Sequence, residues 1–207
     1  KECIESYEKI RVEFVQEDIT QPVLTELETD NASRELSRLL GEMLSETNEL
    51  ENHNGFQFVD GINIDTQKFN PSGSCSKGGL YFTELNKIAL WICYLNQKMK
   101  YIREVEILDD SLVYVEKDKF KANKFILHSR VLLKEFEQWN NFEFCKLAVQ
   151  QNYNALRHVK KQTKEICKLA VQQNGFMLCY IKNQTDEICK LAVQQNGLAL
   201  CYVKKQT

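Results

Sequence analysis

The glycine-rich stretch at residues 73–79 is the first place where the chain could carry chemistry, because such loops can hold a phosphate group. A P-loop has the pattern G-x-x-x-x-G-K-[ST] after a strand and before a helix. Here Lys77 precedes Gly78, and the loop leads into the apolar residues 80–82, which are typical of a strand. The pattern therefore favours a structural loop over a nucleotide site.

Cysteine and histidine side chains give little support for a nucleophile or a metal site. Cys75 lies in the same loop, and His53 or His128 could act as its base, but such pairs arise by chance in a chain of 207 residues. The chain has three histidines and no C-x-x-C pair, so the usual spacing of zinc ligands is absent. We therefore expect no catalytic residue, no cofactor and no metal.

The strongest pattern lies in the last third of the chain, where a unit of 22 residues occurs three times. The copies read EFCKLAVQQNYNALRHVKKQTK, EICKLAVQQNGFMLCYIKNQTD and EICKLAVQQNGLALCYVKKQT. Such a repeat indicates a stack of small units that bury their apolar faces against one another. Recurring side chains would line a ridge of this stack, and we predict that they bind a partner: Lys146, Lys168, Lys190, Lys160, Lys182, Lys204, Gln150, Gln172 and Gln194.

Three interpretations of this ridge stay open. Its lysines could be solvated side chains at helix ends, they could bind an acidic protein partner, or they could follow a phosphate backbone. Residues 141–207 hold ten Lys and Arg against four Asp and Glu. Stacking residues do not recur, since Tyr153 becomes Gly175 and Gly197, so nucleic acid is the weaker choice.

Within each copy, the pattern predicts two short helices. Thr163 or Thr185 can cap the first helix of a copy, in which Ile166, Leu169 and Ala170 share one face. The pair Asn174-Gly175 suits the left-handed residue that ends a helix, and a second short helix follows. The last copy keeps Leu198 and Leu200 where terminal repeats usually present a polar face, so we expect further repeats or self-association through this end.

Cysteine usage indicates a reducing environment. Five of the eight cysteines occupy repeat positions, and free cysteine packs in helices as a small hydrophobe. We therefore predict reduced, buried thiols and a reducing compartment such as the cytosol.

The residues before the repeats predict a mixed domain. Residues 10–14 alternate as in a strand, and a helical stripe follows at Leu36, Leu39, Leu40, Met43 and Leu44. The pair Asp60-Gly61 predicts a hairpin between residues 56–59 and 62–64. Further elements are expected as strands at 80–82, 101–107, 112–115 and 124–127, and as helices at 84–98 and from Ser129 towards Trp139.

The expected fold class is α+β, with an N-terminal mixed α+β domain followed by a short α-helical solenoid of three repeats. We divide the chain into residues 1–49 (strand and amphipathic helix), 50–140 (α+β domain with a helical adaptor) and 141–207 (solenoid). Net charge favours a division, since residues 141–207 carry +6 and the first 140 carry −8. No apolar run is long enough for a membrane span, and the start at Lys1 without a leader indicates a trimmed N-terminus.

Three stretches carry a family resemblance. NGFQFVDGINID (54–65), NPSGSCSKGGLYFT (70–83) and YIREVEILDDSLVYVEKDKFKANKFIL (101–127) resemble giant-virus proteins of the mimivirus type, in which such a domain precedes repeats that are often ankyrin repeats. The units EICKLAVQQNGLALCYVK look like a different short helical repeat found in giant viruses and some bacteria. The resemblance implies a viral protein in an amoebal host, without catalytic residues. The ankyrin signature T-P-L-H is absent.

A second resemblance covers only a few residues. The order of His53, Tyr81 and Glu104 or Glu106 is similar to ADP-ribosyltransferase-like folds, in which a histidine strand and an aromatic strand flank nicotinamide and a carboxylate completes the site. This alternative implies an NAD-binding front domain. The main interpretation is a non-enzymatic interaction or scaffold module that uses the repeat ridge.

Overall fold

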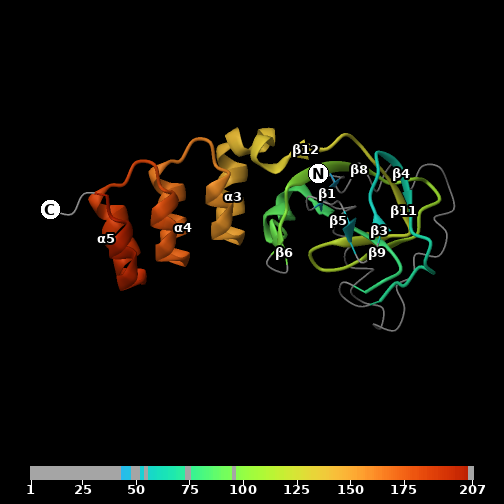
Figure 1. Cartoon of the computed structure of the whole chain (residues 1–207), viewed down its shortest axis with the longest axis horizontal. Coiled ribbons are helices and arrows are strands. Elements are labelled where there is room, and N and C mark those ends of the chain that lie inside the picture. The colour runs from blue at the N-terminus through green and yellow to red at the C-terminus, as the bar shows by residue number, and fades with distance from the viewer. Residues whose placement is uncertain (1–42, 48–51, 54–55, 73–75, 95–96, 205–207) are drawn as a thin grey trace, which may run out of the picture. The chain divides into compact units, whose positions relative to one another are not determined.

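The structure is a computed structural model that describes residues 43–47, 52–53, 56–72, 76–94 and 97–204 (Figure 1). It is mixed α+β, as the sequence predicts. Its contacts define two compact units: unit 1 comprises residues 1–45, 52–84 and 104–129, and unit 2 comprises residues 46–51, 85–103 and 130–207. The predicted division into three ranges stays a prediction. The predicted strand at residues 10–14 lies outside the described residues.

Unit 1 is built on antiparallel strands in the order β4-β11-β8-β1-β5-β10-β9. These strands are β1 (Met43–Thr47), β4 (Gly61–Ile64), β5 (Leu80–Glu84), β8 (Tyr101–Glu106), β9 (Val113–Val115), β10 (Phe120–Ala122) and β11 (Lys124–Leu127). One face buries a core that includes Phe58, Phe82, Phe120 and Phe125. Burying such rings is the main stabilising term for this unit.

The predicted turn at Asp60-Gly61 exists, but the predicted hairpin is wrong. Gly61 adopts a φ of 87°, and the Asn63 side chain, which is buried, accepts from the Val59 amide and donates to the Val59 and Gly61 carbonyls. However, β4 pairs with β11, while β3 (Phe56–Gln57) pairs with β2 (Asn52–His53). The turn therefore moves the chain from one sheet to another.

Two predicted helices need correction in the front half. Met43 and Leu44 belong to β1 and pair with Glu84 and Thr83, so the helical stripe does not extend to them; its other residues lie outside the described part. Residues 84–98 form a short 3₁₀ helix η1 (Leu85–Leu90) followed by the hairpin of β6 (Cys93–Tyr94) and β7 (Gln97–Lys98). Short apolar runs satisfy either periodicity, and tertiary pairing decides here.

The segment after Ser129 is also less helical than predicted. It contains β12 (Val131–Leu132) and the 3₁₀ helices η2 (Leu133–Glu135) and η3 (Glu137–Asn140). Trp139 is fully buried, and its indole Nε1 donates to the Leu133 carbonyl at 2.6 Å. Phe136 has an extended ψ of 126°, which separates the two 3₁₀ turns and prevents one continuous helix.

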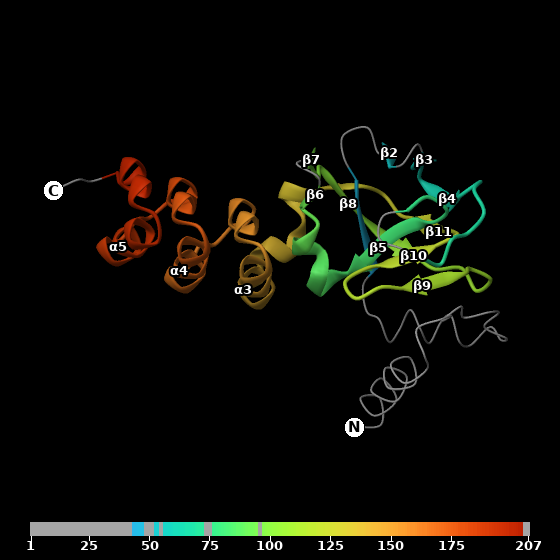
Figure 2. The same cartoon turned by 90° about the horizontal axis from the view of Figure 1, so that it is seen from below.

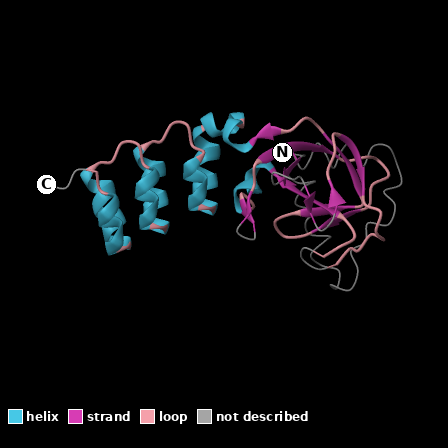
Figure 3. Cartoon of the chain, viewed as in Figure 1, coloured by secondary structure: helices cyan, strands magenta, loops and turns pink. Residues whose placement is uncertain are grey.

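Unit 2 holds three pairs of an α-helix and a 3₁₀ helix, one pair for each sequence repeat (Figure 3). The pairs are α3 (Phe142–Gln151) with η4 (Tyr153–Arg157), α4 (Lys164–Gln173) with η5 (Gly175–Tyr180), and α5 (Asp186–Gln195) with η6 (Gly197–Tyr202). Thr163 and Thr185 cap α4 and α5 as predicted, since each hydroxyl accepts from an amide in the first turn.

The asparagine between the two helices of each pair ends the α-helix as predicted, but it does not adopt the predicted left-handed conformation, and it also caps the second helix. Asn174 has a φ of −151°, so it is extended rather than left-handed. Its side chain accepts from the Phe176 amide at 3.0 Å and caps the start of η5. Asn152 and Asn196 do the same for η4 and η6. The sequence signal therefore also marks the beginning of the second helix.

Gly175 is required by packing rather than by backbone conformation. A Cβ atom placed on it would lie 2.4 Å from the Ala192 carbonyl oxygen of the next repeat. Its amide also donates to Gln195 Oε1 at 2.6 Å. A Cβ atom placed on the equivalent Gly197 would meet no described atom within 4 Å beyond its chain neighbours. The two glycines thus differ only in whether a described repeat packs on them.

Candidate interaction surface

Glutamine clamps join neighbouring repeats on the 3₁₀ side. Gln162 Nε2 donates to the Tyr180 carbonyl, and its Oε1 accepts from the Lys182 amide, both at 3.0 Å. Gln184 makes the same two bonds to Tyr202 and Lys204, again at 3.0 Å. Because these bonds use both ends of each amide, they fix one repeat against the next.

A second series of glutamines acts at the ends of the α-helices. Gln151 Nε2 donates to the Asn86 carbonyl at 2.8 Å, so the first repeat rests on η1. Gln173 Nε2 donates to the Val149 carbonyl at 2.6 Å, and Gln195 holds the Gly175 amide. These amides are therefore occupied in stacking and do not belong to a binding surface.

The lysines of the first predicted ladder are mostly in ion pairs. Lys146 contacts Glu165, and Lys168 contacts Glu187, each at 2.6 Å from Nζ to Oε1. The hydrogen bond to Glu165 raises the pKa of Lys146, and the bond from Lys168 lowers the pKa of Glu187. Lys190 is exposed and has no ion pair among the described residues. The ladder thus presents less free positive charge than its composition indicates.

The second ladder is partly used for structure. Lys160 Nζ donates to the Lys134 carbonyl. Lys204 Nζ donates to the Ile181 and Lys182 carbonyls at 3.0 and 3.1 Å. These ammonium groups therefore satisfy carbonyls that would otherwise lack a donor. The Lys182 side chain is exposed.

The α-helices carry an identical outer stripe in each repeat, formed by Glu, Leu and Gln at positions i, i+4 and i+7. These spacings place the three side chains on one helix face, opposite the face on which Ala148, Ala170 and Ala192 are buried. Figure 2 shows α3, α4 and α5 in one row, with the 3₁₀ helices in a second row. The stripes comprise Glu143, Leu147 and Gln150; Glu165, Leu169 and Gln172; and Glu187, Leu191 and Gln194.

The Gln residues of the stripe are those predicted for binding. All three are exposed, and none makes a hydrogen bond among the described residues: Gln150, Gln172 and Gln194. The Leu and Glu positions were missed from sequence, although their recurrence in every copy is a visible signal. Leu147 is 38% exposed, while Leu169 and Leu191 are half-buried.

The surface of the 3₁₀ helices differs between repeats. The guanidinium of Arg157 lies over the Tyr180 ring, 4.4 Å from its centroid, and Phe176 contacts Tyr202 edge-on. In the first repeat, the equivalent of Tyr180 is His158, which stacks on Trp139 with ring centroids 5.2 Å apart. Burial lowers the pKa of His158 to about 4, assisted by nearby Arg157.

Repeat cysteines fall into two classes, and the prediction that they are all buried is wrong. Cys145 and Cys167 are buried, and burial raises the pKa of each thiol to about 11. Cys179 and Cys201 are exposed, and Cys189 is intermediate. All five are free thiols, as predicted.

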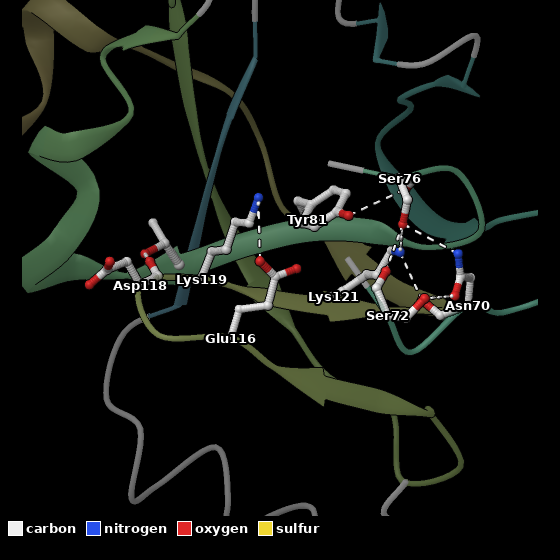
Figure 4. A network of polar contacts seen from close by, with 9 residues as sticks. Asn70, Ser72, Ser76, Tyr81, Glu116, Asp118, Lys119 and Lys121 are labelled. Atoms are coloured by element: carbon white, nitrogen blue, oxygen red, sulfur yellow. Dashed lines mark hydrogen bonds and ion pairs between the residues drawn. The ribbon is translucent and has the colours of Figure 1, made fainter. Parts of the chain in front are cut away.

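A polar network in unit 1 connects the glycine-rich loop to the sheet (Figure 4). Lys121 of β10 is completely buried, and its Nζ donates to the Asn70 carbonyl at 2.8 Å and to Ser76 Oγ at 2.9 Å. Gly79 leaves space for this side chain, because a Cβ there would lie 2.6 Å from Lys121 Cγ. The described part of the loop therefore has a structural role, as the sequence predicts.

Residues of the ADP-ribosyltransferase-like alternative lie on separate strands. Tyr81 is on β5, where its hydroxyl donates to the Ser76 carbonyl at 3.2 Å. Glu104 is exposed on β8, and Glu106 lies 3.2 Å from His128. His53 belongs to β2, and its side chain is not among those that the structure describes. Their joint role stays a prediction.

The described residues contain neither a cluster of metal ligands nor a helix that could cross a membrane. Within the described ranges, no three His, Cys, Asp or Glu side chains gather as a metal site would require. None of the helices described is long and apolar enough to span a bilayer.

The surface therefore defines a repeat module whose α-helices share one exposed stripe. Residues 141–185 and 163–206 each match a domain of unknown function (DUF4116), so the matches overlap by one repeat. The chain is 33% identical over 110 residues to uncharacterized protein R869 of Acanthamoeba polyphaga mimivirus, and the match covers 52% of this chain and 80% of that protein. The chain belongs to the family of this giant-virus protein.

Two putative ankyrin repeat proteins of the same virus are also similar. R868 is 32% identical over 122 residues, covering 56% of this chain and 58% of R868. R229 is 32% identical over 98 residues, covering 43% of this chain and 31% of R229. The chain thus spans less than two thirds of these two relatives. No solved structure matches the chain.

Proposed function

We propose that the chain is a non-enzymatic protein-interaction module of a giant virus, and that its three helix pairs form a short α-solenoid that engages a host or viral protein. The observation that carries this proposal is the outer stripe, which repeats the same side chains on three adjacent helices. A rigid array of this kind presents an extended surface at low conformational cost.

The glutamine contacts between repeats support this function because they use side chains outside the outer stripe. Gln162 and Gln184 hold the stack, whereas Gln172 and its equivalents make no described hydrogen bond. Two relatives are named as ankyrin repeat proteins, and we extend from those names only the general role of a repeat protein as a binding scaffold.

Charge disfavours nucleic acid as the partner. Binding to a phosphate backbone requires several unpaired cations along a continuous track. Lys146 and Lys168 are paired with carboxylates, and Lys160 and Lys204 donate to carbonyls. We propose a protein partner in the host cytoplasm or in the virion.

The proposal is tested by affinity capture from infected amoebae, with the intact chain and with a chain that lacks residues 141–207. We expect a protein that is captured in near-stoichiometric amount only when the repeats are present. Circular dichroism of the shortened chain checks that the remainder is folded. Equal capture by both chains, or no capture by either, would refute the proposal.

The enzymatic alternative has its own test. An NAD-binding front domain would be stabilised by its ligand, by about 2.7 kcal/mol at a hundredfold excess over Kd. We expect no change in the melting temperature on adding NAD. A saturable increase that is lost on Tyr81→Ala would establish the alternative instead.

A further inference from the structure

We propose that the outer stripes of α3, α4 and α5 bind an extended polypeptide segment in the polyproline-II conformation, with an apolar side chain at every third residue. The inference rests on the proposed function and adds the surface and the kind of partner. It depends on four features of the described repeats: the spacing of the helices, the unoccupied amides, the half-exposed leucines and the charges at the two ends.

Spacing sets the period of the partner. Packed helices lie about 8–10 Å apart. A polyproline-II segment has three residues per turn and advances about 3.1 Å per residue, so three residues cover one helix-to-helix step and return the side chain to the same face. In a β-strand, side chains three residues apart point to opposite faces. Ion pairs from Lys146 to Glu165 and from Lys168 to Glu187 hold the three stripes side by side. Each repeat therefore offers the same contacts to every third residue of such a segment.

The amides favour an extended partner over a helical one. Each glutamine of the stripe can donate and accept a hydrogen bond, and none of Gln150, Gln172 and Gln194 does so within the described residues. A helical partner could also match the spacing, with about two turns per step. However, its backbone groups are already bonded to one another, whereas an extended segment has free N–H and C=O groups to offer.

Leucine supplies the apolar part of each contact. Leu147 is 38% exposed, and Leu169 and Leu191 are half-buried beside the glutamines. These positions keep the same residue in all three repeats, while exposed positions on the 3₁₀ helices do not: position 157 is Arg, but positions 179 and 201 are Cys. A surface with three equivalent sites at equal spacing fits a ligand that repeats at the same spacing.

The charges on the first and the last helix determine the direction in which the segment binds. The ion pairs neutralise the middle of the surface and leave Glu143 on the first helix and Lys190 on the last outside any ion pair of the described residues. The segment should therefore carry a basic residue near α3 and an acidic residue near α5. Because two steps separate these helices, the two charges should lie about six residues apart.

A phage-displayed library of random dodecapeptides, selected on the full chain, tests the inference. We expect enriched peptides with apolar residues at every third position and opposite charges at the two ends. Replacing Gln150, Gln172 and Gln194 together by Ala should weaken binding of a fluorescein-labelled selected peptide at least tenfold. The matched control replaces one column of the 3₁₀ side, Arg157, Cys179 and Cys201, by Ala, and should change binding less than twofold.

Circular dichroism checks that both triple variants remain folded. A separate variant, Lys190→Glu, should weaken the binding of peptides that carry the acidic residue at one end. Peptides with a seven-residue period and helical spectra, or binding lost only in the control column, would overturn the inference. So would a library without enrichment while the intact chain still captures a protein, and this outcome leaves the proposed function standing. No binder in either experiment refutes both.

Discussion

Gly175 and Gly197 provide a direct test of the stacking geometry, because the same substitution is predicted to have opposite effects at equivalent positions. A methyl group on Gly175 would overlap the Ala192 carbonyl oxygen at 2.4 Å. The contact involves backbone, so it cannot be relieved by a rotamer change. Overpacking of this kind costs about 1–3 kcal/mol. The hydrogen bond from the Gly175 amide to Gln195 would also be displaced.

Gly197→Ala is the matched control. No described atom beyond the chain neighbours lies within 4 Å of the added methyl group, and the position does not have a positive φ. Alanine restricts the unfolded chain more than glycine does, so this variant should be neutral or more stable by about 0.5 kcal/mol. The difference between the two variants is then about 2 kcal/mol, or about 10 °C in melting temperature for a unit of this size.

The assay is thermal and urea unfolding followed by circular dichroism at 222 nm. The α-helices of the described chain lie in the repeats, so this signal reports on them. We expect Gly175→Ala to lower the midpoint without changing the urea m value. If the two variants agree within about 0.5 kcal/mol, repeats two and three do not pack as described.

Burial also determines three other measurable properties. His158 has a pKa of about 4 in the fold against 6.5 in the unfolded chain, so the unfolded state binds more protons and stability falls as the pH drops from about 6.5 to about 4. The loss at pH 4.5 should be about 2 kcal/mol, and comparing the urea midpoints of the wild type and His158→Tyr at pH 7 and 4.5 isolates it. Lys121→Ala removes the hydrogen bonds to Asn70 and Ser76, so it should destabilise unit 1 by at least about 1 kcal/mol. The same variant should increase proteolysis of the loop at residues 70–79, which timed trypsin digestion measures. In the native protein, iodoacetamide should label the exposed thiols of Cys179 and Cys201 within minutes. The buried thiols of Cys145 and Cys167 should react only after unfolding, and mass spectrometry of the peptides distinguishes the two pairs.

The repeats were the most predictable part of the chain. Their period gave the number of units, and threonines at the right positions gave the starts of α4 and α5. The asparagine-glycine pairs mark the end of the α-helix as predicted, but they also begin the second helix, which was not expected. The extended φ of Asn174 places its side chain over the next turn, where it caps the second helix.

The sheet was less predictable because a buried charge interrupts its pattern. The strand β10 has Lys121 between Phe120 and Ala122, and all three residues are buried. A lysine normally indicates an exposed position, so no strand was expected there. The partners that make this burial acceptable, Asn70 and Ser76, are 51 and 45 residues away in the chain, beyond any local pattern.

The sequence selected the glutamine and lysine columns by their recurrence, and their role in binding stays a prediction. Recurrence alone cannot separate side chains that hold a stack from side chains that face outward. The structure separates them by contact: Gln162 and Gln173 bond to the neighbouring repeat, and Gln172 has no described hydrogen bond. Gln172 and Gln173 are adjacent in one helix, and only the second contacts the neighbouring repeat.

The separation of stacking side chains from surface side chains determines how such an array can bind. Because the glutamine bonds between repeats use side chains outside the outer stripe, we expect them to persist when a ligand binds the stripe. Each helix should then add a similar increment to the binding free energy of a periodic ligand, so affinity should rise by a roughly constant factor with each repeat engaged. The ion pairs from Lys146 to Glu165 and from Lys168 to Glu187 contribute by keeping the stripes in register before the ligand arrives.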